Sequence, residues 1–212
     1  ELAGTTDSIQ GMGNDGSNAA RIYYQRGAKV VAISDVSGGI YCSDGLNIDE
    51  IADYLESNKA LLSDYSADGV THITNEELLT CKCDVLVPAA LENQVNEDIA
   101  GKLNCKYIVE AANGPTTKAA DEILEKRSIT LIPDIFANSG GVIVSYFEWV
   151  QNIQELTWER EQVNEMLENL MTKSFKDLTD VVDECNCTFR MAAYIVALRK
   201  LVYAEEIKGI FP

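Results

Sequence analysis

Short apolar runs separated by longer amphipathic segments occupy the first two thirds of the chain. Four of these runs consist almost entirely of β-branched and other apolar residues, and they lie at residues 30–33, 85–87, 107–109 and 129–132. Continuous runs of this kind are typical of strands that are buried on both faces. Such strands belong to parallel sheets whose faces are covered by helices.

Segments of helical period lie between the runs, and we expect helices at residues 18–25, 48–56, 75–79 and 118–126. Thr74 followed by Glu77 fits a capping box at the start of the third of these helices. The alternation of strand and helix predicts an α/β fold, a doubly wound Rossmann-type sheet that is mostly parallel.

From about Asn138 the pattern becomes helical throughout. We expect two stripes of apolar residues at helical spacing to face a core. The stripes are Val163, Met166, Leu167, Leu170, Phe175, Leu178 and Val182, then Phe189, Ala193, Val196 and Leu201. The economical organisation is one domain over residues 1–212, in which residues 138–212 form a helical C-terminal segment.

Composition narrows the class of partner. The chain has 17 basic and 34 acidic side chains and a formal charge of −17, which repels phosphate backbones, so we expect no nucleic acid as a partner. No apolar run approaches the roughly 20 residues needed to cross a bilayer, so we expect no membrane span. No signal peptide is recognisable, and Glu1 in place of Met suggests that an upstream segment was removed. We therefore expect a cytoplasmic protein.

Cysteine spacing argues against a metal site. The chain has six cysteines, two pairs of which are spaced Cys-x-Cys, and His72 is its only histidine. A common zinc site uses Cys-x-x-Cys spacing, so we expect no metal, and reduced, mostly buried thiols instead. The cysteines are Cys42, Cys81, Cys83, Cys105, Cys185 and Cys187.

The segment from Gly11 to Gly16 matches the pattern G-x-G-x-x-G. In a dinucleotide site Gly11 allows the tight turn between strand and helix, and Gly13 has no side chain to block the pyrophosphate. Gly16 lets the helix pack close to the strand, and the helix N-terminus directs its free N–H groups at the phosphates. We therefore predict that this loop, Asn14 included, binds the cofactor phosphates.

Asp35 ends the next strand, nineteen residues after Gly16. An acidic residue at that place accepts hydrogen bonds from the hydroxyls of the adenosine ribose. Two polar residues fit the pattern less well. Asp7 lies in a first strand that is unusually polar, so it occupies either an exposed strand start or a locally weakened sheet. Asp15 brings a negative charge into the loop, and we expect its side chain to point away from the phosphates.

Five further segments resemble the hexameric glutamate dehydrogenases, and the likeness covers essentially the whole chain. Leucine and phenylalanine dehydrogenases share the fold but usually carry an asparagine pair where this chain has Asn113-Gly114. The segments are residues 34–41 (SDVSGGIY), 88–93 (PAALEN), 110–117 (EAANGPTT), 138–149 (NSGGVIVSYFEW) and 190–194 (RMAAY).

The resemblance implies oxidative deamination of L-glutamate to 2-oxoglutarate and ammonia, with hydride transfer to NAD or NADP, in a homo-hexamer. NAD is slightly favoured, because the carboxylate of Asp35 would repel the extra phosphate of NADP. By position, Ala89, Asn93 and Asn113 would line the cofactor groove, and Asn138 would lie near the nicotinamide. Val142 and Ser145 match positions that contact the substrate.

The family's catalytic lysine and aspartate belong to an N-terminal substrate domain, and no lysine of this chain has the expected glycine-rich surroundings. We therefore predict no catalytic acid or base here, and expect the substrate domain as a partner. Two alternatives stay open. One is a freestanding NAD(P)-binding or regulatory module without catalysis, and the other is a dehydrogenase of another amino acid.

Overall fold

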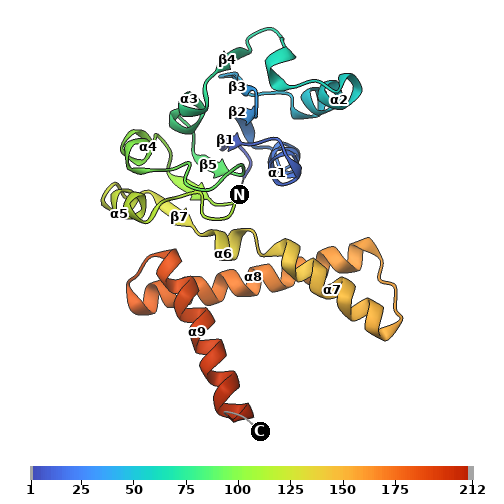
Figure 1. Ribbon diagram of the computed structural model, residues 1–212, viewed down its shortest axis with the longest axis vertical. Helices are drawn as coiled ribbons and strands as arrows, with labels where there is room; N and C mark the ends of the chain where they lie inside the picture. The colour runs from blue at the N-terminus through green and yellow to red at the C-terminus, as the bar shows by residue number, and fades with distance from the viewer. Residues whose placement is uncertain (1, 210–212) are drawn as a thin grey trace. The chain divides into compact units, whose positions relative to one another are not determined.

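The computed structural model describes residues 2–209 (Figure 1). Its contacts form two compact units, Glu1–Asp134 and Ile135–Pro212, which we call the sheet unit and the helical unit. Each is described by itself below.

One sheet of seven strands, in the order β4-β3-β2-β1-β5-β6-β7, organises the sheet unit. The β2–β1, β1–β5, β5–β6 and β6–β7 pairs are parallel, whereas β3 pairs antiparallel with both β2 and β4. The predicted Rossmann-type, mostly parallel sheet is therefore confirmed. The strands are β1 Thr6–Gln10, β2 Lys29–Asp35, β3 Gly38–Tyr41, β4 Thr71–Ile73, β5 Val85–Pro88, β6 Tyr107–Val109 and β7 Thr130–Ile132.

Helices cover both faces of this sheet (Figure 1). Residues of α3, α4 and α5 pack with Val31, Leu86 and Ile108 in one hydrophobic cluster, whereas residues of α1 and α2 pack with Ile9 and Ile33 in another. All four predicted helices of this unit are present. The elements are α1 Asn14–Gln25, α2 Ile48–Asn58, the 3₁₀ turn η1 Leu62–Asp64, α3 Asn75–Thr80, α4 Glu97–Lys102 and α5 Lys118–Lys126.

The capping box at α3 is confirmed. The Glu77 N–H donates to Thr74 Oγ1 at 3.2 Å, and the Thr74 N–H donates to Glu77 Oε2 at 2.8 Å. Five short elements escaped prediction: β3, which begins with two glycines, the three-residue strand β4, the six-residue helix α4, the 3₁₀ turn η1 and the four-residue helix α6 Asp134–Ala137. None of them is long enough to show a clear hydrophobic period.

Asp7 is the exception in the sheet's core. Its side chain is fully buried, so the alternative of an exposed strand start is wrong. The β1–β2 register shifts between Asp7 and Ser8, which agrees with a local irregularity of the sheet. Thr5 Oγ1 lies 3.1 Å from Asp7 Oδ2 but shares its single proton with the Leu2 carbonyl at 2.7 Å, and Asp7 Oδ1 has no hydrogen-bond partner in the protein. Burial raises the pKa of Asp7 to about 7 against the lowering effect of the Thr5 bond, and the nearby Asp84 carboxylate raises the pKa further.

The helical unit contains α7 Gly140–Gln154, α8 Arg160–Cys185 and α9 Phe189–Lys208, preceded by the short helix α6 Asp134–Ala137. Its buried core is small and includes Leu178 and Ala193 of the predicted stripes. The expectation of a core position is wrong for three other stripe residues, because that core does not extend along the whole of α8 and α9. These are Leu170, Phe175 and Leu201, which are 42%, 40% and 63% exposed.

Over residues 2–209, no helix combines the length and the hydropathy required to span a bilayer. The same residues contain no group of three or more His, Cys, Asp and Glu side chains arranged to hold a metal ion. All six cysteines are free thiols, but only Cys42 and Cys83 are buried. The expectation of mostly buried thiols is therefore wrong, since Cys185 is exposed and the others are half-buried.

Candidate functional site

The candidate site lies where the order of the strands reverses. From β1 the chain crosses through α1 to β2 on one side, whereas β5 pairs with β1 on the other side. In open α/β sheets, ligands bind outside the carboxyl ends of the strands at such a switch point. We therefore expect a cofactor to bind at the loops that follow β1 and β5.

Two glycines of the first loop are required by the protein's own packing. Gly11 has a φ of +96°, and a Cβ there would lie 2.9 Å from the carbonyl oxygen of Ala89. A Cβ on Gly16 would lie 1.8 Å from the carbonyl oxygen of Gly11, which is an impossible contact. Gly16 thus lets α1 pack directly on the turn that Gly11 makes. The N–H of Gly11 also donates to Ser34 Oγ at 3.2 Å, which ties the turn to the end of β2.

Gly13 is different, because nothing in the protein requires a glycine there. It is exposed, its φ of −72° suits any residue, and a Cβ would meet no atom within 4 Å. The open space lies at the start of α1, whose first intrahelical bond runs from the Ser17 N–H to the Gly13 carbonyl at 2.9 Å. The N–H groups of Asn14, Asp15 and Gly16 precede that bond and have no partner within the helix. A pyrophosphate that approaches this backbone fits the space that a side chain at Gly13 would fill.

The loop after β5 is fastened on both sides. The Ala89 N–H donates to the Gln10 carbonyl at 2.9 Å, and the Asn93 N–H donates to the Gly114 carbonyl at 2.9 Å. Asn93 is exposed and has a φ of +57°, a conformation that asparagine tolerates better than most residues, so it also serves the turn. Asn113 is exposed on the neighbouring loop after β6. Four predicted residues thus share one edge of the sheet: Gly13, Ala89, Asn93 and Asn113.

The sequence does not predict the amide network in which the buried Gln10 bonds to the more exposed Asn75 and Gln94. Gln10, at the end of β1, is only 2% exposed, and its Nε2 donates to Asn75 Oδ1 at 2.8 Å and to Gln94 Oε1 at 2.9 Å. The network holds the loop that carries Asn93 against the end of β1. The polar character of the first strand was the available signal, but the partners of Gln10 come from distant parts of the chain.

The carboxylate of Asp35 is partly engaged by the protein. Its Oδ1 accepts hydrogen bonds from the N–H and the Oγ of Ser37, at 2.7 and 2.5 Å, and its Oδ2 accepts from the Leu62 N–H at 2.8 Å. An ionised carboxylate offers about four acceptor positions, so one position on Oδ2 is left for a ligand hydroxyl. Asp35 therefore shapes the turn between β2 and β3 and retains the capacity to bind a ribose.

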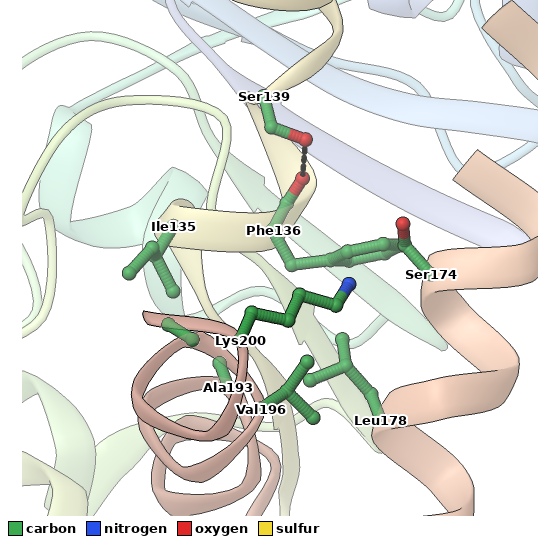
Figure 2. Close-up of a pocket in the computed structure, with 9 residues that line it drawn as sticks. Ile135, Phe136, Ser139, Ser174, Leu178, Ala193, Val196 and Lys200 are labelled. Atoms are coloured by element: carbon green, nitrogen blue, oxygen red, sulfur yellow. Dashed lines mark hydrogen bonds between the residues drawn. The ribbon is translucent and has the colours of Figure 1, made fainter. Parts of the chain in front are cut away.

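The remaining predicted residues belong to the helical unit. Asn138 is half-buried just before α7, whereas Val142 and Ser145 are exposed on α7 and lie three residues apart, on one face of the helix. A shallow cavity of about 210 Å³ in the same unit is lined by other residues, which include Phe136, Leu178 and Lys200 (Figure 2). The predicted substrate positions therefore do not line this cavity.

Comparisons with known proteins show which family the chain belongs to. A family model described as glutamate/leucine/phenylalanine/valine dehydrogenase matches residues 1–209. The chain belongs to this family. The resemblance inferred from the sequence is thereby confirmed.

Three relatives in the glutamate/leucine/phenylalanine/valine dehydrogenase family illustrate the match. The chain is 44% identical to a cryptic catabolic NAD-specific glutamate dehydrogenase of Bacillus subtilis, in an alignment that covers 99% of this chain and 48% of the relative. It is also 44% identical to an NADP-specific glutamate dehydrogenase of Halobacterium salinarum, with 100% and 51% covered. The hetero-hexameric glutamate dehydrogenase of Thermus thermophilus superposes with a TM-score of 0.90 at 28% identity, over 100% of this chain and 49% of that one. The chain thus spans about half the length of these relatives.

Proposed function

We propose that this chain is the cofactor-binding portion of an NAD(P)-dependent glutamate dehydrogenase, an enzyme that oxidatively deaminates L-glutamate to 2-oxoglutarate and ammonia. The observation that carries the proposal is the open space at Gly13, which the packing of the protein does not explain and a bound pyrophosphate does. The relatives named above are glutamate dehydrogenases, which disfavours both a freestanding regulatory module and a dehydrogenase of another amino acid.

Within this proposal the first turn of α1 binds the pyrophosphate through its free N–H groups. Ala89, Asn93 and Asn113 would line the groove for the rest of the cofactor, and Asn138 would serve the nicotinamide. An asparagine amide suits this place because it offers both a donor and an acceptor to a carboxamide or a ribose hydroxyl. When bound, the nicotinamide accepts the hydride from the substrate.

Val142 and Ser145 would contact the substrate from α7, as the corresponding family positions do. Neither residue supplies an acid or a base for the proton transfers of deamination. The proposal therefore assigns the catalytic lysine and aspartate to a separate substrate domain, and the complete enzyme to a homo-hexamer.

For cofactor choice, we propose a modest preference for NAD. The position left on Asp35 Oδ2 would accept a ribose hydroxyl, and its negative charge would disfavour the 2′-phosphate of NADP. The relatives include both NAD-specific and NADP-specific enzymes, so the preference rests on Asp35 alone.

The test is a calorimetric titration of the purified chain with NADH and with NADPH. Replacing Gly13 with valine should lower the affinity for both by at least about tenfold, which is 1.4 kcal/mol or more, because the side chain occupies the space of the pyrophosphate. Circular dichroism should be unchanged, since a Cβ at this position meets no protein atom within 4 Å.

Gly101→Val is the matched control. Gly101 lies on α4, and a Cβ there also meets nothing within 4 Å, so this variant should bind both cofactors like the parent chain. If Gly13→Val binds with the parent's affinity, the loop does not hold a pyrophosphate and the proposed function loses its support.

A further inference from the structure

Three cysteines gather at the edge of the sheet opposite the glycine loop. Cys81 follows α3 directly, Cys83 lies two residues before β5, and Cys105 lies two residues before β6. Val85 pairs with Tyr107 in the parallel β5–β6 register, and the Cys83 N–H donates to the Asn104 carbonyl at 3.1 Å. Cys83 and Cys105 are therefore neighbours at the amino ends of adjacent strands, whereas the glycine loop follows the carboxyl end of β1.

The three thiols are not equivalent. Cys83 is 5% exposed, whereas Cys81 is half-buried, so solvent reaches the Cys81 sulfur more easily. Cys81 packs against the hydrophobic cluster that contains Cys83, and the neighbouring Cys83 thiol is the main reason that the pKa of Cys81 is lowered to about 7. Burial opposes this shift. The Ser8 hydroxyl contributes little to it, because that hydroxyl donates its single proton to the Leu78 carbonyl at 3.0 Å.

The other two thiols are protected from ionisation. The neighbouring Cys81 thiol raises the pKa of Cys83, and burial raises it further. Burial raises the pKa of Cys105 to about 11. A half-buried thiol with a lowered pKa thus lies at the same hydrophobic cluster as a buried thiol that retains its proton, which suits the roles of an attacking and a resolving thiol.

A metal is not the explanation for the cluster, since residues 2–209 contain no group of three ligands arranged to hold one. The cluster and the glycine loop lie at opposite ends of the strands, and the cluster contributes no residue to the loop. Its chemistry is therefore independent of the proposed cofactor site.

We propose that Cys81 and Cys83 form a thiol–disulfide exchange site that reacts with low-molecular-weight disulfides. The Cys81 thiolate attacks one sulfur of the disulfide RS–SR, a new bond joins Cys81 to SR, and the other half leaves as RS⁻. Cys83 then loses its proton and attacks the Cys81 sulfur, which releases the second RS⁻. The two cysteines are oxidised to one disulfide by loss of two protons and two electrons, and RS–SR is reduced to two thiols.

Tryptic digestion separates the possible products. Lys82 separates the two cysteines, so trypsin places Cys81 on the peptide of residues 60–82 and Cys83 on that of residues 83–102. Cys105 falls on residues 103–106, and the exposed Cys185 falls on residues 177–190. Only a disulfide keeps two of these peptides together after digestion.

The experiment treats the reduced, full 212-residue chain with hydroxyethyl disulfide at pH 7, quenches with acid and maps the tryptic peptides by mass spectrometry. Peptides 60–82 and 83–102 should emerge as one species that lacks two hydrogen atoms. In Cys83→Ser, a stable mixed disulfide between Cys81 and one half of the reagent should accumulate on peptide 60–82 instead. Cys185→Ser is the control, and it should form the linked pair at the parent's rate.

Three results would overturn the proposal. One is a link between peptides 83–102 and 103–106, which would replace Cys81 by Cys105. Another is a first adduct on peptide 177–190, which would mean that simple exposure governs reactivity. The third concerns the pH dependence of Cys81 alkylation by iodoacetamide, whose rate should have its midpoint near pH 7. A midpoint above about pH 8 would mean that Cys81 reacts like an ordinary thiol.

Discussion

Replacing Asp7 with asparagine should alter the stability of the sheet unit by an amount that depends on pH. The pKa of this buried carboxyl is raised from 3.8 to about 7, so the folded protein holds the proton more tightly than the unfolded chain does. Between about pH 4 and pH 7 the unfolded state therefore binds fewer protons, and the unfolding free energy of the parent chain falls as pH rises. Above about pH 7 the loss is complete and the curve levels off.

The size of the effect follows from the shift. A difference of about 3 pKa units at 1.36 kcal/mol per unit corresponds to about 4 kcal/mol. Asparagine has a similar shape and does not ionise, so Asp7→Asn lacks this loss. The unfolding free energy of the variant minus that of the parent should rise by up to about 4 kcal/mol between pH 4 and pH 8.

The assay must report on the sheet unit. Both tryptophans, Trp149 and Trp158, lie in the helical unit, so tryptophan fluorescence would follow the wrong part of the chain. Hydrogen exchange of peptides that span β1 and β5, measured across the pH range, follows the opening of the sheet itself. Asp68→Asn, at an exposed turn, is the control for removing one negative charge.

Two results would contradict this expectation for Asp7. If the difference between Asp7→Asn and the parent stays constant from pH 4 to pH 8, the carboxyl does not titrate differently in the folded state. If the variant instead becomes relatively less stable as pH rises, the ionised carboxylate has a partner that stabilises it.

Three further predictions concern the loop, the turn and the activity. Gly16→Ala should destabilise the sheet unit by about 3 kcal/mol, because its Cβ would overlap the Gly11 carbonyl. Urea unfolding followed by circular dichroism measures the loss, and a smaller loss than that of Gly101→Ala would contradict this prediction. Asp35→Ser should weaken NADH binding by about 1.5–3 kcal/mol and shift the NADH-to-NADPH affinity ratio toward NADPH, whereas an unmoved ratio in calorimetry would mean that Asp35 does not contact the ribose. The chain by itself should oxidise no L-glutamate with NAD or NADP, and formation of reduced cofactor above a buffer blank would place catalytic residues within it.

The sequence predicts the elements whose signal is local. Apolar runs predict the parallel strands β2, β5, β6 and β7, although β6 and β7 are only partly buried, and the capping box of α3 lies within four consecutive residues. No apolar run predicts the antiparallel strand β3, because its first two residues are glycines. Its pairing is decided by the turn that Asp35 shapes. The length of α4, six residues, is likewise too short for a hydrophobic period to emerge.

At the candidate site, too, the sequence predicts local features but not contacts between distant parts of the chain. The requirement for Gly16 follows from its spacing to Gly11, since a Cβ on Gly16 would collide with the Gly11 carbonyl. The bond from the Leu62 N–H to Asp35 joins residues 27 apart, and the bond from Gln10 to Gln94 joins residues 84 apart. Contacts of this range exist only once the strands are ordered, so the sequence could name Asp35 but not the hydrogen bonds that already engage it.

The unequal demands on the three glycines have a consequence for directed evolution. A library selected only for solubility or heat resistance would retain Gly11 and Gly16, because any side chain there collides with backbone. The same selection would not act on Gly13, where an added Cβ meets no atom within 4 Å. If the proposed function holds, variants enriched in this way would keep their melting temperature and lose cofactor affinity, and substitutions at position 13 would be the first sign of that loss.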